Sequence, residues 1–346
     1  MVIAYHLFIH GFSLGWSGVF LFFVLSGFLI TRILAHDKSE PHFFARFYSR
    51  RALRVFPIYY LLFASVLSVA LIRGWHPLSD WPWFAFYLQN WRLAHTSFSP
   101  DFPVVLNHTW TLATEEQFYF LWPLIVFFGS RTVLRFAIVG LILIGFLYRT
   151  ATILVGQNVY DVLTPFLGSV DFLAWGAGAT FLLRGQHPRR LAIGARVAFV
   201  ALAICVGTMA IAHGLDNFWA PKDYLHDIWT GILFPELLGL LFASLLLVVY
   251  TDNGLITRIL EWSPIRYLGR VSYGLYLYHW PILVAVQMIA GDRRCPILGD
   301  QLIRCLIVIS LTVIVAILSF EFIERPLLAL RGTVILFKPV RGETAS

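Results

Sequence analysis

Two histidines near the start of the chain, His6 and His10, have a type and a spacing that could do chemistry. They are four residues apart in VIAYHLFIHGF, so on a helix they share one face. That spacing can bind a metal ion, but no third ligand is evident nearby. A histidine in an apolar helix is also commonly a hydrogen-bonded core residue. The metal, core and, for His6, catalytic interpretations therefore stay open.

Three arginines, Arg50, Arg51 and Arg54, precede an apolar stretch in FYSRRALRVFPIYYL. Arg51 and Arg54 are three residues apart and so stack on one helix face, where two guanidinium groups can grip phosphate oxygens in bidentate forks. The alternative is that they anchor the helix at the membrane surface. Pro57, one turn later, predicts a helix boundary.

Two adjacent acids, Glu115 and Glu116, lie in HTWTLATEEQFYFLWPL. Their side chains point about 100° apart on a helix, and both cannot face lipid without a large cost in free energy. At least one should line a hydrated cavity or meet an arginine. The other could serve only the start of its helix, with Thr111 as the predicted N-cap.

Two later stretches add polar side chains to apolar helices. FEFIERPL places Glu321 and Glu324 three residues apart, before Arg325-Pro326 ends the helix. YLGRVSYGLYLYHWPIL carries a hydroxyl-rich face. The residues of that face are Arg270, Ser272, Tyr273, Tyr276, Tyr278 and His279.

The composition decides which kind of element must position these residues. The 346 residues are 59% hydrophobic and only 13% charged, whereas soluble domains carry about 25% charged residues. This composition predicts an integral membrane protein in a lipid bilayer. The net charge of +7 arises from basic residues in short connections between apolar stretches. It is therefore a sign of topology, and we expect no nucleic acid partner.

The apolar stretches predict an all-α, polytopic transmembrane helical bundle of about ten spans. A span needs roughly 20 apolar residues. The stretch before Ser13 is too short as written, which makes the first span incomplete. The other nine are 16–34, 55–73, 111–129, 134–155, 163–183, 191–213, 228–250, 271–290 and 302–323.

The distribution of Lys and Arg predicts the orientation. Most of the 26 basic residues fall on one side if the connection 35–54 and the C-terminus are cytoplasmic. The long connection 74–110, rich in Trp and Pro, then lies outside. It is either a folded cap over an external cavity or an interfacial anchor. Cys295 and Cys305 face the same outer side, where a disulfide is possible.

Five of these stretches together resemble the acyltransferase family 3 membrane proteins. They occur in that family's order and cover nearly the whole chain. They read VFLFFVLSGFLIT, SRRALRVFPIYYL, HTWTLATEEQFYFLWPL, VSYGLYLYHWPI and FIERPL. The resemblance implies one membrane domain over 1–346, in the cell membrane. It also implies an O-acyltransferase that moves an acyl group, often acetyl, from acyl-CoA at the cytoplasmic face to a carbohydrate, envelope glycan or glycosylated small molecule.

The resemblance also implies roles for individual residues. AYHLF matches the family's histidine at His6 and not at His10, and the Arg-x-x-Arg element matches Arg51 and Arg54. The remaining matches are Glu116 with its neighbour Glu115, His279, and Glu324. The family's arginine about ten residues before the histidine has no counterpart, because the chain begins five residues before His6. We therefore expect a start upstream or a trimmed chain, and no soluble domain after about residue 340.

A mechanism follows as a hypothesis. Moving an acyl group from a thioester to an alcohol requires a base, an oxyanion donor and a site for the CoA phosphates. His6 is the predicted base, with Glu116 or Glu324 orienting it. Arg51 and Arg54, helped by Arg50, hold the phosphates, and no metal is expected. Ser26 in LSGF is an oxyanion donor, an acyl carrier, or a packing residue beside Gly27.

The amino-acid sequence leaves two further questions open. Direct transfer and transfer through an acyl-enzyme both fit these residues, and the sequence does not name the acceptor or the acyl chain. A transporter or flippase without acyl transfer is the alternative function, since ten spans with charges near the midplane fit that class as well.

Overall fold

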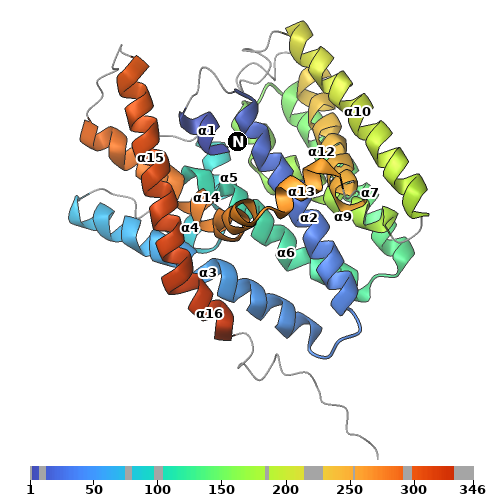
Figure 1. Ribbon diagram of the computed structural model, residues 1–346, viewed down its shortest axis with the longest axis horizontal. Coiled ribbons are helices and arrows are strands. Elements are labelled where there is room, and N and C mark those ends of the chain that lie inside the picture. The colour runs from blue at the N-terminus through green and yellow to red at the C-terminus, as the bar shows by residue number, and fades with distance from the viewer. Residues whose placement is uncertain are drawn as a thin grey trace, which may run out of the picture. The chain divides into compact units, whose positions relative to one another are not determined.

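The computed structural model describes residues 2–7, 13–74, 80–96, 104–183, 187–213, 229–251, 254–290 and 298–330. Every regular element in these ranges is a helix (Figure 1), which confirms the predicted all-α class. The chain divides into two compact units. Unit 1 comprises 1–36 and 76–267, and unit 2 comprises 37–75 and 268–346.

The nine predicted spans coincide with nine of the described helices. Six candidate spans are long and apolar enough to cross a membrane, while α9 is shorter and α6 and α14 are more polar. The short stretch before Ser13 contains α1 (Val2–Leu7). The nine helices are α2 (Gly18–Asp37), α3 (Phe43–Ile72), α6 (Trp110–Phe128), α7 (Arg131–Leu154), α9 (Phe166–Leu182), α10 (Pro188–His213), α12 (Phe234–Thr251), α14 (Ser263–Ala290) and α15 (Leu298–Ser319).

The long connection before α6 folds against that helix within unit 1. It forms α4 (Trp81–Ala85), α5 (Gln89–His95) and the 3-10 helix η3 (Val104–Thr109). Gln89 and Asn90 are fully buried. Gln89 Nε2 donates to the Thr109 carbonyl at 2.9 Å, and Gln117 Nε2 donates to Asn90 Oδ1 at 2.9 Å. Buried amides bonded to α6 fit a folded cap better than an interfacial anchor, while the cavity beneath it stays a prediction.

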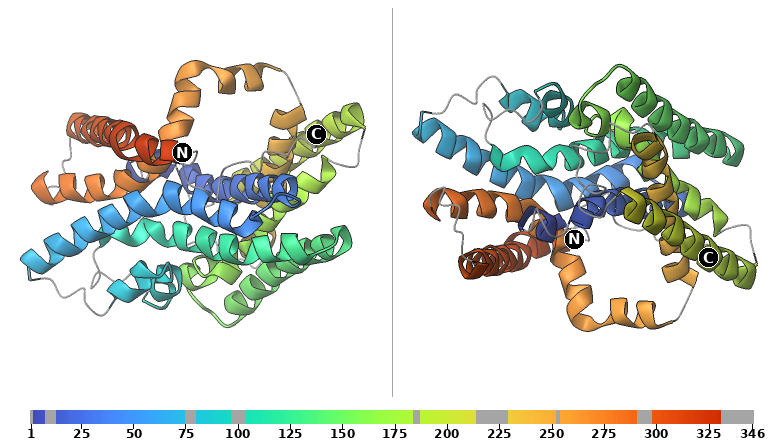
Figure 2. Two further views of the ribbon diagram at one scale, coloured as in Figure 1. Left: turned by 90° about the horizontal axis from the view of Figure 1, so that it is seen from below. Right: turned by 90° about the horizontal axis from the view of Figure 1, so that it is seen from above.

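Unit 1 is held together by close helix packing. Helices α7, α9, α12 and α10 follow one another side by side (Figures 1 and 2). Helix α2 approaches α9 at two glycines. A Cβ at Gly27 would lie 1.9 Å from the Leu173 carbonyl oxygen, and one at Gly176 would lie 1.9 Å from that of Val24. Small residues at such crossings let two membrane helices come close enough for backbone packing.

We predict that Gly176→Ala lowers the thermal stability of the protein, because the added methyl group must push α2 and α9 apart. Overpacking of this kind typically costs about 1–3 kcal/mol. The measurement is the unfolding temperature in detergent. Gly140→Ala in α7 is the matched control, since a Cβ there meets nothing within 4 Å. An unchanged unfolding temperature for Gly176→Ala would contradict the close crossing.

Unit 2 contains α3, most of α14, α15, and the two short elements that follow it. These are the π-helical turn η5 (Phe320–Glu324) and α16 (Arg325–Ala329), both of which pack on α3 (Figure 1).

Helix α3 runs for 30 residues, through Pro57. The predicted boundary at Pro57 is therefore wrong. Membrane helices tolerate proline because neighbouring groups satisfy the freed backbone carbonyl.

The length of α3 places its arginines near a membrane surface. From Val55 to its last residue, Ile72, the helix rises about 27 Å at roughly 1.5 Å per residue. A hydrocarbon core is about 30 Å thick. Arg51 and Arg54 therefore immediately precede the part of α3 that can cross the bilayer.

Candidate active site

The predicted base, His6, lies in α1 of unit 1 and is half-buried. Its ring packs beside that of Tyr5, with centroids 5.4 Å apart and tilted by 51°. His10 lies outside the described residues. Among the residues that are described, no group of three or more His, Cys, Asp and Glu could hold a metal ion.

Ser26, on α2, joins a polar cluster with two side chains of α6 in unit 1. Its hydroxyl donates to Glu115 Oε1 at 2.5 Å and lies 2.5 Å from the Tyr119 hydroxyl. Gly27, the next residue, makes the close crossing with α9. The polar contacts of Ser26 and the helix packing of Gly27 are therefore separate roles. Glu115 therefore accepts a hydrogen bond from a serine hydroxyl in this cluster. Glu116, next to it, is also half-buried.

The predicted role of Thr111 as N-cap is wrong. Helix α6 begins at Trp110, its N-cap is Thr109, and its first turn contains no acid. Thr111 Oγ1 instead donates to the carbonyl of His108 at 3.2 Å. Glu115 and Glu116 therefore lie in the second turn, so neither acid serves only to start the helix.

The arginines lie on α3 in unit 2. Arg50 Nη1 forms an ion pair with Asp37 Oδ2 at 3.2 Å, so part of its charge is already compensated within the protein. Arg51 is half-buried, whereas Arg54 is exposed. The helical spacing of Arg51 and Arg54 keeps them on one face, as the phosphate-binding interpretation requires.

Glu324, in η5 of unit 2, is buried, with 5% of its surface exposed. Its carboxyl lies near the Ser319 hydroxyl and is close enough to Arg54 for electrostatic attraction. Arg54 and Glu324, which come from the two sequence segments of unit 2, are thus close enough to attract each other.

Three predicted residues of α14 bond to the backbone. Tyr273 donates to the Val55 carbonyl at 3.0 Å, which ties α14 to α3 one residue after Arg54. Ser272 donates to the Gly269 carbonyl of its own helix at 2.8 Å. His279 is buried, and its Nδ1 lies 2.6 Å from the Tyr276 carbonyl. These contacts indicate structural roles for Ser272 and His279.

The predicted site residues divide between the two units. His6, Ser26, Glu115 and Glu116 belong to unit 1. The arginines, Ser272, Tyr273, His279 and Glu324 belong to unit 2. That residues of both groups act together in one site stays a prediction. The disulfide between Cys295 and Cys305 does too, because Cys295 lies outside the described residues.

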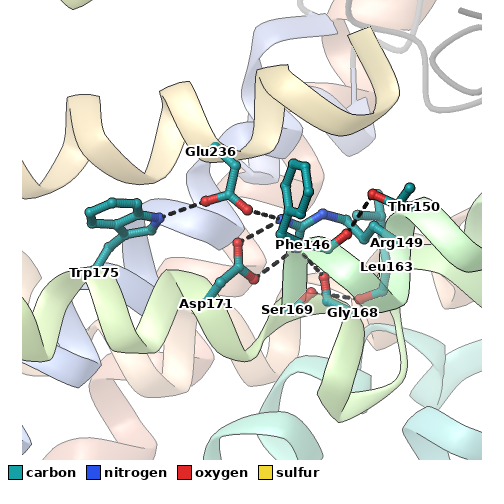
Figure 3. Close-up of polar contacts among 9 residues, drawn as sticks. All are labelled: Phe146, Arg149, Thr150, Leu163, Gly168, Ser169, Asp171, Trp175 and Glu236. Atoms are coloured by element: carbon teal, nitrogen blue, oxygen red, sulfur yellow. Dashed lines mark hydrogen bonds and ion pairs between the residues drawn. The ribbon is translucent and has the colours of Figure 1, made fainter. Parts of the chain in front are cut away.

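Unit 1 also contains a buried charge network that the sequence motifs did not predict (Figure 3). Arg149 of α7 and Asp171 of α9 are fully buried, and both guanidinium ends bond the carboxylate at 2.8 Å. Arg149 also donates to Glu236 Oε1 of α12 at 2.6 Å and to the Gly168 carbonyl at 2.8 Å. Trp175 Nε1 donates to Glu236 Oε2 at 3.0 Å.

This network links three helices through one guanidinium group. Two carboxylates face one arginine, and Arg149 donates to Asp171, Glu236 and the Gly168 carbonyl through its two terminal nitrogens. Small residues make room for it, since a Cβ at Gly145 would lie 2.8 Å from Asp171 and one at Gly239 would lie 2.3 Å from Trp175. A signal was available in the sequence, because each of the three apolar spans contains one of these ionisable residues, and such residues usually have partners.

The helices and the charges buried between them define the class of the protein, a helical membrane protein that crosses the bilayer several times. Residues 1–321 match the acyltransferase domain that defines acyltransferase family 3. The chain therefore belongs to this acyltransferase family, which confirms the resemblance seen in its motifs.

Curated relatives point to the same family. The chain is 29% identical over 344 residues to the peptidoglycan O-acetyltransferase OatA of Listeria monocytogenes. It is 28% identical over 348 residues to the O-acetyltransferase OatA of Staphylococcus aureus. Each alignment includes 94% of this chain but only 53% and 55% of the relative, so the chain spans about half the length of these proteins. No solved structure matches the chain.

Proposed function

We propose that this protein is a membrane O-acyltransferase that moves an acyl group, acetyl in the simplest case, from acyl-CoA to a hydroxyl of a cell-envelope glycan. The observation that carries the proposal is the family match over residues 1–321. A relative named as a peptidoglycan O-acetyltransferase makes peptidoglycan the first acceptor to test. Family membership also favours acyl transfer over the transporter or flippase alternative.

The proposed reaction assigns tasks to several of the predicted residues. His6 takes the proton of the acceptor hydroxyl as its oxygen bonds the thioester carbonyl carbon. The carbon–sulfur bond then breaks, and the imidazolium returns the proton to the sulfur of the leaving CoA. Glu116 or Glu324 orients the imidazole. Ser26, bonded to Glu115 and Tyr119, is the candidate for an oxyanion donor or an acyl carrier.

The proposed donor site lies at the cytoplasmic face of the cell membrane. Arg51 and Arg54 precede the membrane-crossing part of α3, and the connection 35–54 and the C-terminus are cytoplasmic in the orientation that Lys and Arg predict. Two guanidinium groups on one helix face match the diphosphate of CoA. Arg50 contributes less in this proposal, because Asp37 already pairs with it.

We predict that Arg54→Ala raises the KM for acyl-CoA about tenfold or more, since a charge-assisted hydrogen bond contributes about 1.5–3 kcal/mol. The measurement is the initial rate of free CoA release at varied acetyl-CoA. Arg46→Ala is the matched control on the same helix, because Arg46 pairs with Glu40 at 3.0 Å. An unchanged KM for Arg54→Ala would support the anchoring interpretation of these arginines.

The proposed function is tested in cells by the O-acetyl content of the cell wall. A bacterium whose peptidoglycan lacks O-acetyl groups receives either this chain or its His6→Ala variant. Acetate released from the purified wall by mild base is then measured. We expect acetate above the background only with the unaltered chain. Equal acetate from both strains, with both proteins present in the membrane, would count against peptidoglycan as the acceptor.

A further inference from the structure

A π-helical turn gives Glu324 partners that an α-helix would not provide. Helix α15 ends at Ser319, and the next five residues, Phe320–Glu324, form η5. Two residues five apart point about 140° away from each other on an α-helix, which advances about 100° per residue. In a π-helix, hydrogen bonds join residues i and i+5. The turn therefore brings Ser319 to the same side as Glu324, and the serine hydroxyl lies close to the carboxyl.

A third residue, Tyr278 of α14, extends this pair within unit 2. Its hydroxyl lies 2.9 Å from Ser319 Oγ. Either hydroxyl can be the donor in this pair. Because Ser319 also lies close to the Glu324 carboxyl, the three side chains form a polar chain that runs from α14 through the end of α15 to η5.

One oxygen of the buried Glu324 carboxyl has no such partner. Oε1 accepts no hydrogen bond from any residue in the described part of the chain, although only 5% of the surface of Glu324 is exposed. A buried oxygen of this kind normally finds a donor. The other oxygen is left for Ser319, and Arg54 attracts the group as a whole. The carboxyl is thus held on one side and open for a donor on the other.

We infer that Tyr278 and Ser319 are positioning residues for Glu324. They fix the carboxyl so that Oε1 accepts a hydrogen bond from a reacting group. The inference rests on the proposed acyl transfer. It adds two residues outside the set that the sequence predicted as the site, and it gives the π-helical turn a purpose. Such turns occur often at functional sites.

The test is steady-state kinetics of the purified, reconstituted chain with acetyl-CoA and soluble peptidoglycan fragments. We expect Ser319→Ala to lower kcat about tenfold, the effect of losing one neutral hydrogen bond of about 1.4 kcal/mol. The KM for acetyl-CoA should stay within about twofold, because Arg51 and Arg54 are untouched. Ser319→Thr, which keeps the hydroxyl, should restore kcat.

A second comparison separates a linked chain from two independent contacts. Tyr278→Phe should lower kcat as well, and the Tyr278→Phe/Ser319→Ala double variant should be no slower than Ser319→Ala alone, because both changes break one chain. Thr312→Val is the matched control. Thr312 is buried seven residues earlier on α15, and its hydroxyl has no partner among the described residues, so kcat should not change.

The outcomes distinguish the inference from the function on which it rests. Full kcat in Ser319→Ala, failure of Ser319→Thr to restore it, or multiplied losses in the double variant would each overturn the positioning role while acyl transfer stands. The positioning role is also overturned if the loss in kcat equals a loss of folded protein in a thermal unfolding assay. An unaltered chain that transfers no acetyl group would overturn both.

Discussion

Replacement of His6 by alanine is expected to lower the rate of acyl transfer by about 10²–10⁴-fold, the usual contribution of a general base. Without the imidazole, the acceptor hydroxyl has no group of suitable pKa to take its proton at neutral pH. The loss should appear in kcat, since the CoA phosphates are held by other residues in the proposed site. The measurement is acetate transfer by the purified protein at saturating acetyl-CoA.

Two further variants make this prediction specific to the imidazole as a base. His6→Gln keeps a polar side chain that forms hydrogen bonds but cannot act as a base, so it should be as slow as His6→Ala. His36→Ala, at the exposed end of α2, should leave the rate unchanged. Transfer by His6→Ala within about threefold of the unaltered protein would remove His6 from the mechanism.

Replacement of Arg149 by leucine is expected to be the most destabilising change in unit 1. It leaves the carboxylates of Asp171 and Glu236, which are fully and largely buried, without their cation. Breaking a buried ion pair by removing one partner typically costs about 3–5 kcal/mol. The measurement is the fraction of protein that stays monodisperse in detergent, together with its unfolding temperature.

A combined variant tests whether the loss of stability in Arg149→Leu comes from uncompensated buried charge. Replacing Arg149, Asp171 and Glu236 together by apolar residues of similar volume should recover much of the stability, because no unpaired charge then remains. Arg135→Leu is the control on the same helix, since Arg135 is exposed and should tolerate the change. If Arg149→Leu unfolds at the temperature of the unaltered chain, the three helices are not joined by this network.

The fold was largely predictable because hydropathy determines which segments can cross a bilayer. Every predicted span from residue 16 onward has a helix, since the backbone must satisfy its own hydrogen bonds in lipid. Local details were less predictable. Pro57 does not end α3, because membrane helices tolerate proline within a span. Thr111 is not the cap, because the helix begins at Trp110, two residues earlier than a cap at Thr111 requires.

The candidate site was predictable only in part, for a physical reason. Single residues can be recognised by type, and the sequence predicts both Glu324 and Arg54 as site residues. Partners that come from distant segments cannot be read from spacing. Asp171 and Glu236 lie 22 and 87 residues away from Arg149 in the sequence. Ser319 lies on the same side as Glu324 only because the backbone widens to a π-turn, and an α-helical period predicts that the two residues point apart.

The most direct measurement of the central claim is acetyl transfer by the purified chain in lipid nanodiscs. The protein is incubated with acetyl-CoA labelled in the acetyl group and with soluble peptidoglycan fragments, and both free CoA and labelled glycan are quantified. We predict equal amounts of the two products, formed only when the acceptor is present, with the label removed from the glycan by mild base. A folded protein that forms neither product with any envelope glycan, or that releases CoA without labelling a hydroxyl, would contradict the claim that this chain is an O-acyltransferase.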